Sequence, residues 1–376
     1  MQFIPQRLDR VHRAMNRDSL DAVILTRRSD VQYLTGYGYP NKSLPACCIL
    51  AGVKQPVLVV SELESKAIEH ENTVAQVFTV SSDLDDDWGG IRGPVFWQTA
   101  ARALKEAGVQ TGMLGLQHSS LTIKEFEVLK SLLPDAGFRD FSDSMWRLRQ
   151  VKEPGEVDLI RQATRVAEIG LRTALEIITP GKTEVEASIE IAAAMGAAGG
   201  ELRGIRAAVL SRHPLRHTLV NPSVERIRAD SLVVVDITAS YEGYFAQVAR
   251  TLHTGSPSAE ERRAYETALE IQSTLEEHLQ SGVVLGEAVS AAVRAAEAGS
   301  GPPCRAILPM GNSIGLELRE PPSLVSGSTE YAREGMVFSL CPLCMCSERI
   351  AAKVGDEVLV TSAGCETLSS LVRETM

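Results

Sequence analysis

The chain contains no long apolar segment. None of its hydrophobic runs approaches the roughly 20 residues that a helix needs to cross a bilayer, and no signal-peptide pattern opens the sequence. Basic residues are also in deficit, with 38 Lys and Arg against 48 Asp and Glu and a formal net charge of −10. These features favour a cytoplasmic protein that binds neither membranes nor nucleic acids.

Cysteine is sparse and odd in number. Seven cysteines in 376 residues argue for a reducing compartment rather than a disulfide framework. Cys341, Cys344 and Cys346 have C-x2-C-x-C spacing. On a strand, however, residues 341 and 344 point to opposite faces, and no second Cys or His pair follows. This spacing is therefore a poor zinc motif.

The length predicts two domains, each large enough to bury a core. Strands alternating with helices indicate an α/β domain over residues 1–150, and a boundary falls near 149–155. Two long helices follow, and a strand-rich remainder predicts an α+β domain over residues 151–376. Two capping boxes mark predicted helix starts: Thr122 with Glu125, and Thr183 with Glu186.

Several phrases resemble the creatinase/aminopeptidase P (pita-bread, M24) family. They are LDAVILTRRSDVQYLTGY near the start, VKEPGEVDLIRQA and PGKTEVE after the boundary, and SLVVVDITASYEGYFAQVARTLHTG at 231–255. The resemblance covers nearly the whole chain. It implies an α/β N-terminal creatinase-like domain, an α+β C-terminal pita-bread domain and a homodimer.

The resemblance also identifies the positions that bind metal in metal-dependent members. Those members have an Asp, matched by Asp236, followed by a second Asp, a His and two Glu. The matching positions here hold Gln247, Asn312, Cys341 and Gly355. Two divalent ions need several anionic oxygens or imidazoles, and the neighbouring Asp356 should point to the other face of its strand. We therefore expect a family member without metal or any other cofactor.

Gly315–Pro322, GLELREPP, is similar to a creatinase phrase with Arg where the peptidases have His. Creatinase is the metal-free, C–N-hydrolysing member, and the resemblance implies that Arg319 anchors a substrate carboxylate through two charge-assisted hydrogen bonds. The alternative is a structural ion pair with Glu317 or Glu320. Creatinase holds its cationic substrate head with two Glu, matched here by Ala249 and Cys341. A cation there would lack a counter-charge, so an amide, lactam or cyclic amidine fits better than creatine.

Hydrolysis also needs an acid or base, and His is suited to that role near neutral pH. The family has such a His near the segment that contains His213 and His217. His217 is our first choice and His213 our second. A shifted alignment puts Val220 at the position of the family's His instead. Asp236 would orient His217 or hydrogen-bond substrate, or only cap a turn. Cys341 is either a nucleophile or a small apolar filler.

Further substrate contacts are expected from neutral and basic side chains. Gln247 and Asn312 offer donors and acceptors for an amide or carboxyl group. Tyr39 and Lys42 follow the YLTGY phrase, a region that reaches the partner's pocket in creatinase-like dimers.

Three functions remain open. The first is a metal-independent, creatinase-like hydrolase of a non-peptide C–N bond in a small, carboxylate-bearing, non-cationic molecule, with elimination or rearrangement as variants of the reaction. The second is a non-catalytic pita-bread protein that binds a peptide or protein. The third is a divergent metal-dependent Xaa-Pro peptidase.

Overall fold

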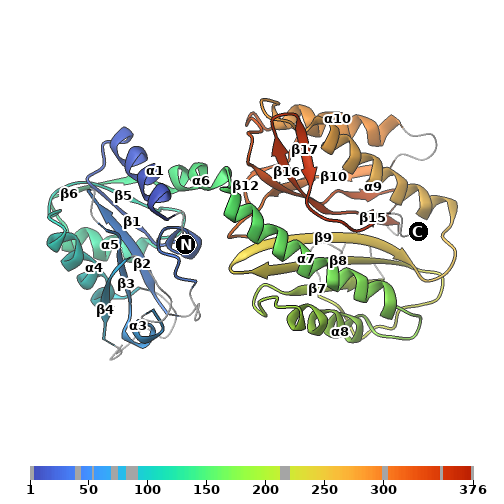
Figure 1. The fold of residues 1–376 in the computed structure, drawn as a ribbon, viewed down its shortest axis with the longest axis horizontal. Helices are drawn as coiled ribbons and strands as arrows, with labels where there is room; N and C mark the ends of the chain where they lie inside the picture. The colour runs from blue at the N-terminus through green and yellow to red at the C-terminus, as the bar shows by residue number, and fades with distance from the viewer. Residues whose placement is uncertain are drawn as a thin grey trace. The chain divides into compact units, whose positions relative to one another are not determined.

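The computed structural model describes residues 4–38, 44–52, 55–68, 75–81, 92–211, 221–298, 304–347 and 350–373. The chain divides into two compact units, Met1–Arg149 and Gln150–Met376 (Figure 1). No helix within the described ranges is long and apolar enough to cross a membrane.

The first unit is built on one six-stranded mixed sheet with the order β4-β3-β2-β1-β5-β6 (Figure 1). The central strand β1 pairs parallel with β5 and antiparallel with β2. Helices alternate with the strands, as predicted. In chain order the elements are α1 (Ile4–Arg17), β1 (Ala22–Leu25), α2 (Arg28–Thr35), β2 (Ala46–Ala51), β3 (Val57–Ser61), α3 (Glu62–Ile68), β4 (Gln76–Val80), α4 (Pro94–Glu106), β5 (Gly112–Leu116), α5 (Ile123–Leu132), β6 (Ala136–Asp140) and α6 (Ser142–Gln150).

The core of this unit forms between the sheet and α4, whose Phe96 and Trp97 are buried against the apolar strands. Helix α5 begins at the predicted capping box. The Thr122 hydroxyl accepts a hydrogen bond from the Glu125 amide at 3.2 Å, and the Glu125 carboxylate accepts one from the Thr122 amide at 2.7 Å. These bonds satisfy two amides that the first turn of a helix leaves unpaired.

The second unit opens with α7 (Pro154–Ile177) and α8 (Glu184–Ala197). The predicted capping box of Thr183 and Glu186 begins α8. Both helices pack on a three-stranded sheet of β7 (Arg206–Leu210), β8 (Leu232–Tyr241) and β9 (Tyr244–His253), in which all neighbours are antiparallel (Figure 1).

Strand β8 has two chemically different faces. Val233, Val235, Ile237 and Ala239 enter the apolar core formed with α7 and α8. Because side chains alternate along a strand, the even-numbered residues, Asp236 among them, point to the opposite face. The sequence thus sets one face for packing and leaves polar groups on the other.

Two further sheets and two helices complete the second unit. The five-stranded sheet has the order β12-β11-β13-β16-β17 and the three-stranded sheet the order β10-β14-β15, with α9 packed on β14, β15 and β17 and α10 packed on α9 and β10. The elements are α9 (Ala259–His278), α10 (Leu285–Ala298), β10 (Arg305–Ile307), β11 (Gly311–Ser313), β12 (Glu320–Ser323), β13 (Val337–Leu340), β14 (Leu343–Met345), β15 (Ala351–Lys353), β16 (Asp356–Thr361) and β17 (Gly364–Thr367). This mixture of helices and antiparallel sheets is the predicted α+β arrangement.

One backbone bridge joins the sheets of the second unit. The amides and carbonyls of Ala249, on β9, and Gly355, just before β16, form two reciprocal hydrogen bonds of 3.1 and 2.9 Å. This bridge holds β9 against β13, β15 and β16.

Candidate functional site

A buried ion pair lies on the polar face of β8. The Lys353 ammonium, at the end of β15, donates to the Asp236 carboxylate with an Nζ–Oδ2 distance of 2.5 Å. The two residues are only 3% (Asp236) and 5% (Lys353) exposed. Burial opposes both charges, but each charge stabilises the other, so the pKa of Asp236 is lowered and the pKa of Lys353 is raised. The pair is therefore ionised at neutral pH.

Two polar side chains adjoin this ion pair. Gln247, on β9, donates from Nε2 to Oδ1 of Asp236 at 2.7 Å. Thr238 lies opposite Gln247 in the β8–β9 register and on the same face as Asp236. The Thr238 hydroxyl is buried and has no hydrogen-bond partner in the part of the chain that the structure describes. Such a hydroxyl costs about 1–3 kcal/mol, so it marks a place for a bound polar group.

Cys341 follows β13 on the side of the site formed by the C-terminal sheets. Its Sγ lies 3.5 Å from the Ser339 hydroxyl. Burial raises the pKa of the Cys341 thiol to about 11, with Asp236 adding to the effect and Lys353 opposing it. Because the thiolate is the reactive form, this environment favours the interpretation of Cys341 as a filler over that of a nucleophile.

Asn312 lies on β11, and Arg319 ends the loop that connects β11 to β12. The Asn312 amide donates to the backbone oxygens of Ser313 at 2.7 Å and Leu318 at 3.0 Å, so it holds this loop. Arg319 is exposed and makes no ion pair or hydrogen bond within the described residues. Its neighbour Glu320 instead pairs with Lys152, Nζ to Oε2 3.2 Å, in a buried contact. Arg319 is thus available to an external carboxylate.

Four predicted site residues lie outside the described ranges: Tyr39, Lys42, His213 and His217. The alternative position Val220 lies outside them as well. The structure therefore brings together Asp236, Gln247 and Cys341. It places Asn312 on β11 and Arg319 in the loop that follows. The histidines stay predictions.

A buried carboxyl group, that of Glu357, borders the site. It accepts hydrogen bonds from the backbone amide of Gln247 and from the Thr164 hydroxyl, the latter at 3.5 Å. Burial, with a contribution from Asp356, raises the pKa of Glu357 to about 8. Glu357 is therefore mostly protonated at neutral pH and adds no negative charge beside Asp236.

Two family models match the chain. Residues 158–362 match the model described as metallopeptidase family M24, and residues 7–151 match the creatinase/prolidase N-terminal domain. The chain belongs to metallopeptidase family M24. This confirms the resemblance found in the sequence, together with the predicted two-part creatinase-like and pita-bread architecture.

Similar M24 proteins align along the full length of the chain. The Xaa-Pro dipeptidase of Pyrococcus horikoshii is 27% identical over 100% of this chain and 99% of the relative. The X-Pro aminopeptidase structure from Thermotoga maritima superimposes with a TM-score of 0.83 at 20% identity, covering 97% of this chain and 98% of the other. The prolidase structure from P. horikoshii gives 0.81 at 24% identity, covering 99% and 100%.

These M24 relatives correct the expected substrate. The sequence favoured an enzyme that hydrolyses a non-peptide C–N bond in a small, non-cationic molecule, and it placed such a molecule as the main partner. That expectation is wrong, because the full-length relatives are named as dipeptidases and prolidases. Arg319 and the missing acidic residues resemble creatinase, whereas the chain as a whole aligns with dipeptidases and prolidases.

The residues at the M24 metal positions do not fit a pair of metal ions. Asp236 is already neutralised by the Lys353 ammonium, and Gln247 supplies an amide. A Cβ added at Gly355 would lie 2.9 Å from the Cys341 Sγ and 3.2 Å from the Ala249 Cβ, so the space of the missing Glu is filled. The buried Lys353 ammonium and the lack of space for a larger side chain at residue 355 both oppose metal binding.

Asp356 does not supply a replacement ligand. Its carboxylate accepts from Arg250 at 2.9 Å and from Arg373 at 2.8 Å, which confirms that it turns away from the site. In the described part of the chain, the group of potential ligands that lies close together is elsewhere, at Cys304, Cys344 and Cys346.

Lys353 is the site residue that sequence reasoning missed. A signal was present, because Lys353 stands two residues before Gly355 in an extended segment, and residues two apart share a face. A lysine facing a ligand position in an apolar strand requires a buried carboxylate partner. Asp236 is that partner.

Proposed function

We propose that this M24 protein binds short peptides of the Xaa-Pro dipeptide class at the Asp236–Lys353 site and does so without metal. The observation that carries the proposal is the 2.5 Å contact between Lys353 and Asp236, which replaces a metal ion by a fixed ammonium group. The full-length likeness to Xaa-Pro dipeptidases supports the ligand class.

The groups around the ion pair suit a peptide. An ammonium has three N–H donors, and Asp236 accepts the one hydrogen bond that Lys353 Nζ makes within the described residues. The remaining donors and the buried Thr238 hydroxyl match a peptide carbonyl. The exposed guanidinium of Arg319 matches the C-terminal carboxylate of a dipeptide, which it would bind in bidentate fashion.

The same groups argue against hydrolysis. Peptide cleavage in a metal site depends on a water whose pKa the metal lowers. An ammonium held by Asp236 does not coordinate water in that way, and the Cys341 thiol is protonated. The proposal is therefore a binding protein derived from a peptidase fold, in line with the principle that function depends on the site rather than the fold.

Dipeptidase activity is the second candidate, because the full-length relatives carry that name. It requires a metal or an acid–base group that the described residues at the five matched positions do not supply. His217 and His213 remain proposals for that group.

Calorimetry and an activity assay on the same purified chain test the proposal. We expect a prolyl dipeptide such as Ala-Pro to bind to metal-free protein, with no release of free proline even after addition of Mn²⁺ or Co²⁺. Lys353→Met should abolish binding. Lys182→Met is the matched control, since Lys182 forms an exposed ion pair with Glu190 at 2.9 Å.

Two results would overturn the proposal. Stoichiometric metal in the purified chain together with proline release would establish the peptidase candidate instead. Unchanged dipeptide binding in Lys353→Met would exclude the ammonium as a contact.

We further propose that the protein is a cytoplasmic homodimer. Light scattering of the purified chain tests the oligomeric state, and a mass of one chain would reject the dimer.

A further inference from the structure

Three cysteine sulfurs meet beneath α9 and α10. Strand β10 pairs antiparallel with β14 so that Ala306 lies opposite Cys344 and Arg305 opposite Met345. Continuing this register by one residue sets Cys304 opposite Cys346, and alternation sets Cys344 on the same face as both. The Sγ atoms of Cys304, Cys344 and Cys346 all lie within 4.8 Å of one another.

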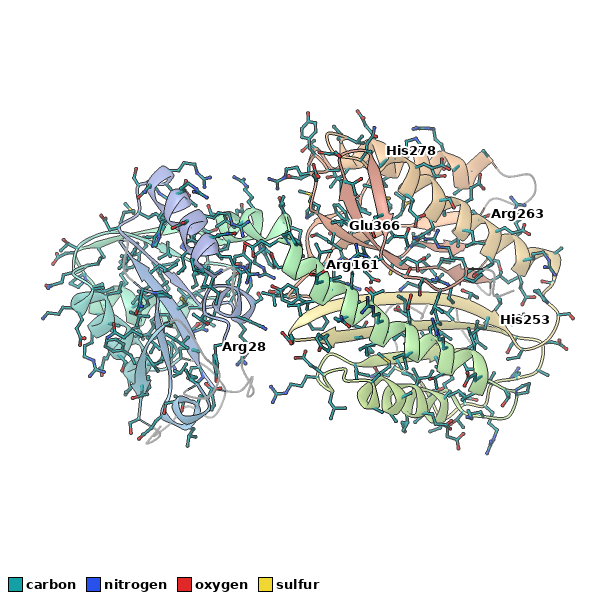
Figure 2. All side chains as sticks on the ribbon, viewed as in Figure 1. Arg28, Arg161, His253, Arg263, His278 and Glu366 are labelled. Carbon is teal, nitrogen blue, oxygen red and sulfur yellow. A yellow bond between two sulfur atoms is a disulfide. The ribbon has the colours of Figure 1, made fainter. Side chains whose placement is uncertain are left out.

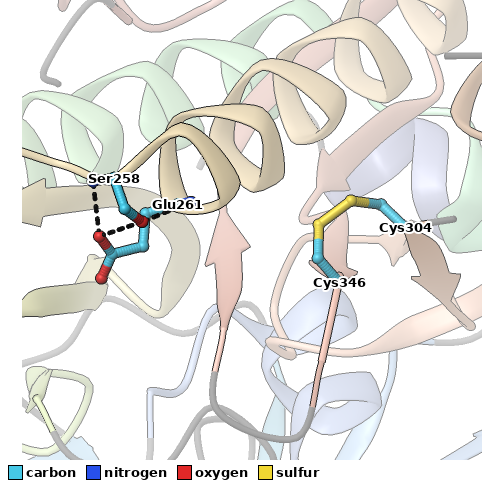
Figure 3. Close-up of a disulfide and its surroundings, with 4 residues drawn as sticks. All are labelled: Ser258, Glu261, Cys304 and Cys346. Atoms are coloured by element: carbon cyan, nitrogen blue, oxygen red, sulfur yellow. Dashed lines mark hydrogen bonds between the residues drawn. A yellow bond between two sulfur atoms is a disulfide. The ribbon is translucent and has the colours of Figure 1, made fainter. Parts of the chain in front are cut away.

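Two of these sulfurs form a disulfide. Cys304 and Cys346 are bonded across the strand pair, 42 residues apart in sequence (Figure 3). The sequence argued against a disulfide framework, and this pair comes from a strand register that cysteine spacing does not reveal. Cys344 is a third sulfur beside the disulfide, with a free thiol.

The environment of the cluster is closed on one side and open on the other. Cys304 and Cys344 belong to the apolar core under α9 and α10, whereas Cys346 is partly exposed. Arg263, on α9 (Figure 2), acts electrostatically on Cys344 in the sense that favours a thiolate. Within the described residues, Cys346 is therefore the most exposed of the three sulfur-bearing side chains.

We propose that the reduced form of Cys304, Cys344 and Cys346 is a zinc site with three thiolate ligands. A tetrahedral zinc ion with Zn–S bonds of about 2.3 Å sets two sulfurs about 3.8 Å apart, so small side-chain shifts complete the geometry. Three protein ligands and one water are a common zinc arrangement. The Arg263 guanidinium offsets part of the excess negative charge of three thiolates around one divalent ion.

Zinc binding and the disulfide exclude each other because they share two sulfurs. A dithiol or phosphine reductant supplies two electrons, which break the Cys304–Cys346 disulfide into two thiolates. Two protons from water convert these thiolates into thiols. Zinc then displaces the protons of all three thiols, and three protons are released to solvent.

The test is a zinc titration of the whole chain after reduction by a phosphine and removal of the reductant. A chromophoric chelator competes for the metal, and mass spectrometry counts the cysteines that an alkylating reagent modifies. We expect one zinc per chain, with Cys304, Cys344 and Cys346 protected from alkylation. Protein that retains the disulfide should bind no zinc at this site.

Single substitutions assign the ligands. Cys344→Ser and the more exposed Cys346→Ser should each weaken zinc binding at least tenfold, with circular dichroism confirming that each variant is folded. Cys365→Ser is the matched control, since that thiol donates to the Glu276 carbonyl at 3.2 Å outside the cluster. Cys341→Ser should also retain zinc, because Cys341 belongs to the Asp236 site.

The proposal fails if the reduced wild-type chain binds no zinc more tightly than folded Cys346→Ser. It also fails if Cys341→Ser abolishes binding, since the metal would then lie at the Asp236 site.

Discussion

Two buried ion pairs lie near the Ala249–Gly355 bridge, and they differ in how fully their hydrogen bonds are used. Arg250 donates to the carbonyls of Ala249 at 2.8 Å, Gly355 at 2.9 Å and Leu371 at 3.1 Å, and to the carboxylate of Asp356 at 2.9 Å. Its partner Asp356 also accepts from Ser369 and Arg373. Nearly every polar side-chain atom of this pair therefore makes a hydrogen bond.

The pair of Lys353 and Asp236 is less complete. Within the described ranges the Lys353 ammonium donates to Asp236 alone, and the nearby Thr238 hydroxyl has no partner. A fully hydrogen-bonded pair holds strands together, whereas donors left over beside a buried charge suit a ligand. Arg250 and Asp356 therefore form a structural ion pair, whereas Lys353 and Asp236, in the same unit, form an ion pair suited to binding.

Removing Arg250 should have the largest effect. Arg250→Met leaves the Asp356 carboxylate and several carbonyls without a partner, so we expect the free energy of unfolding to fall by about 3–5 kcal/mol. Urea denaturation measures the change. Arg161→Met is the control, because its pair with Glu366 (Figure 2), at 2.9 Å, is partly exposed and worth about 1 kcal/mol or less. If both substitutions lower the free energy of unfolding by the same amount, the Arg250–Asp356 pair is not a special structural contact.

A double variant should show whether Lys353 stabilises the fold mainly by neutralising the buried charge of Asp236. Lys353→Met alone leaves Asp236 charged and buried, and it should cost about 3 kcal/mol. The double variant Asp236→Asn, Lys353→Met should regain most of that loss, because a neutral pair removes the uncompensated charge. Urea denaturation again gives the values. If the double variant is as unstable as the single one, Lys353 is needed for packing rather than charge.

Glu357 should give the protein a pH-dependent stability. Its folded pKa, about 8, lies above the ordinary Glu pKa of 4.5. Its contribution to stability is therefore fully present below the unfolded pKa and is lost as pH rises through about 8. We expect wild-type stability, relative to Glu357→Gln, to decline by on the order of 1 kcal/mol per pH unit across that window. If the stabilities of the wild type and Glu357→Gln change in parallel between pH 4.5 and about pH 8, Glu357 is not buried in protonated form.

The smallest effect on stability is expected at Arg319. Because its side chain is exposed, Arg319→Ala should change the free energy of unfolding by no more than about 0.5 kcal/mol. Dipeptide affinity should nevertheless fall about tenfold through loss of the carboxylate contact. Arg172→Ala, at an exposed position of α7, is the control. Calorimetry with a C-terminally amidated dipeptide, whose affinity should not depend on Arg319, checks the assigned partner.

The fold was largely predictable because it is encoded locally. The alternation of β8 between apolar and polar residues, and the capping boxes at Thr122 and Thr183, depend on residues a few positions apart. The match of several phrases in the right order then sufficed to identify the family. The substrate class was not predictable from the same residues, since the emphasis on Arg319 favoured creatinase.

The site was predictable only in part, for a physical reason. The family resemblance identified Asp236 and the four positions that lack the other ligands. It did not reveal that Lys353, from another sheet, pairs with Asp236, nor that Cys304 forms a disulfide with Cys346. The first contact depends on how two sheets pack and the second on the pairing of β10 with β14, and spacing within one strand carries no information about either.

The filled space at Gly355 has an evolutionary consequence. A Glu restored there would meet the Cys341 sulfur, and any metal it helped to bind would face the Lys353 ammonium. Exchange of Cys341 or Lys353 alone would not restore the missing ligands and, for Lys353, would leave Asp236 as an unpaired buried charge. Each single substitution toward a metal site is therefore unfavourable by itself, so this chain would need several substitutions together to gain a metal centre.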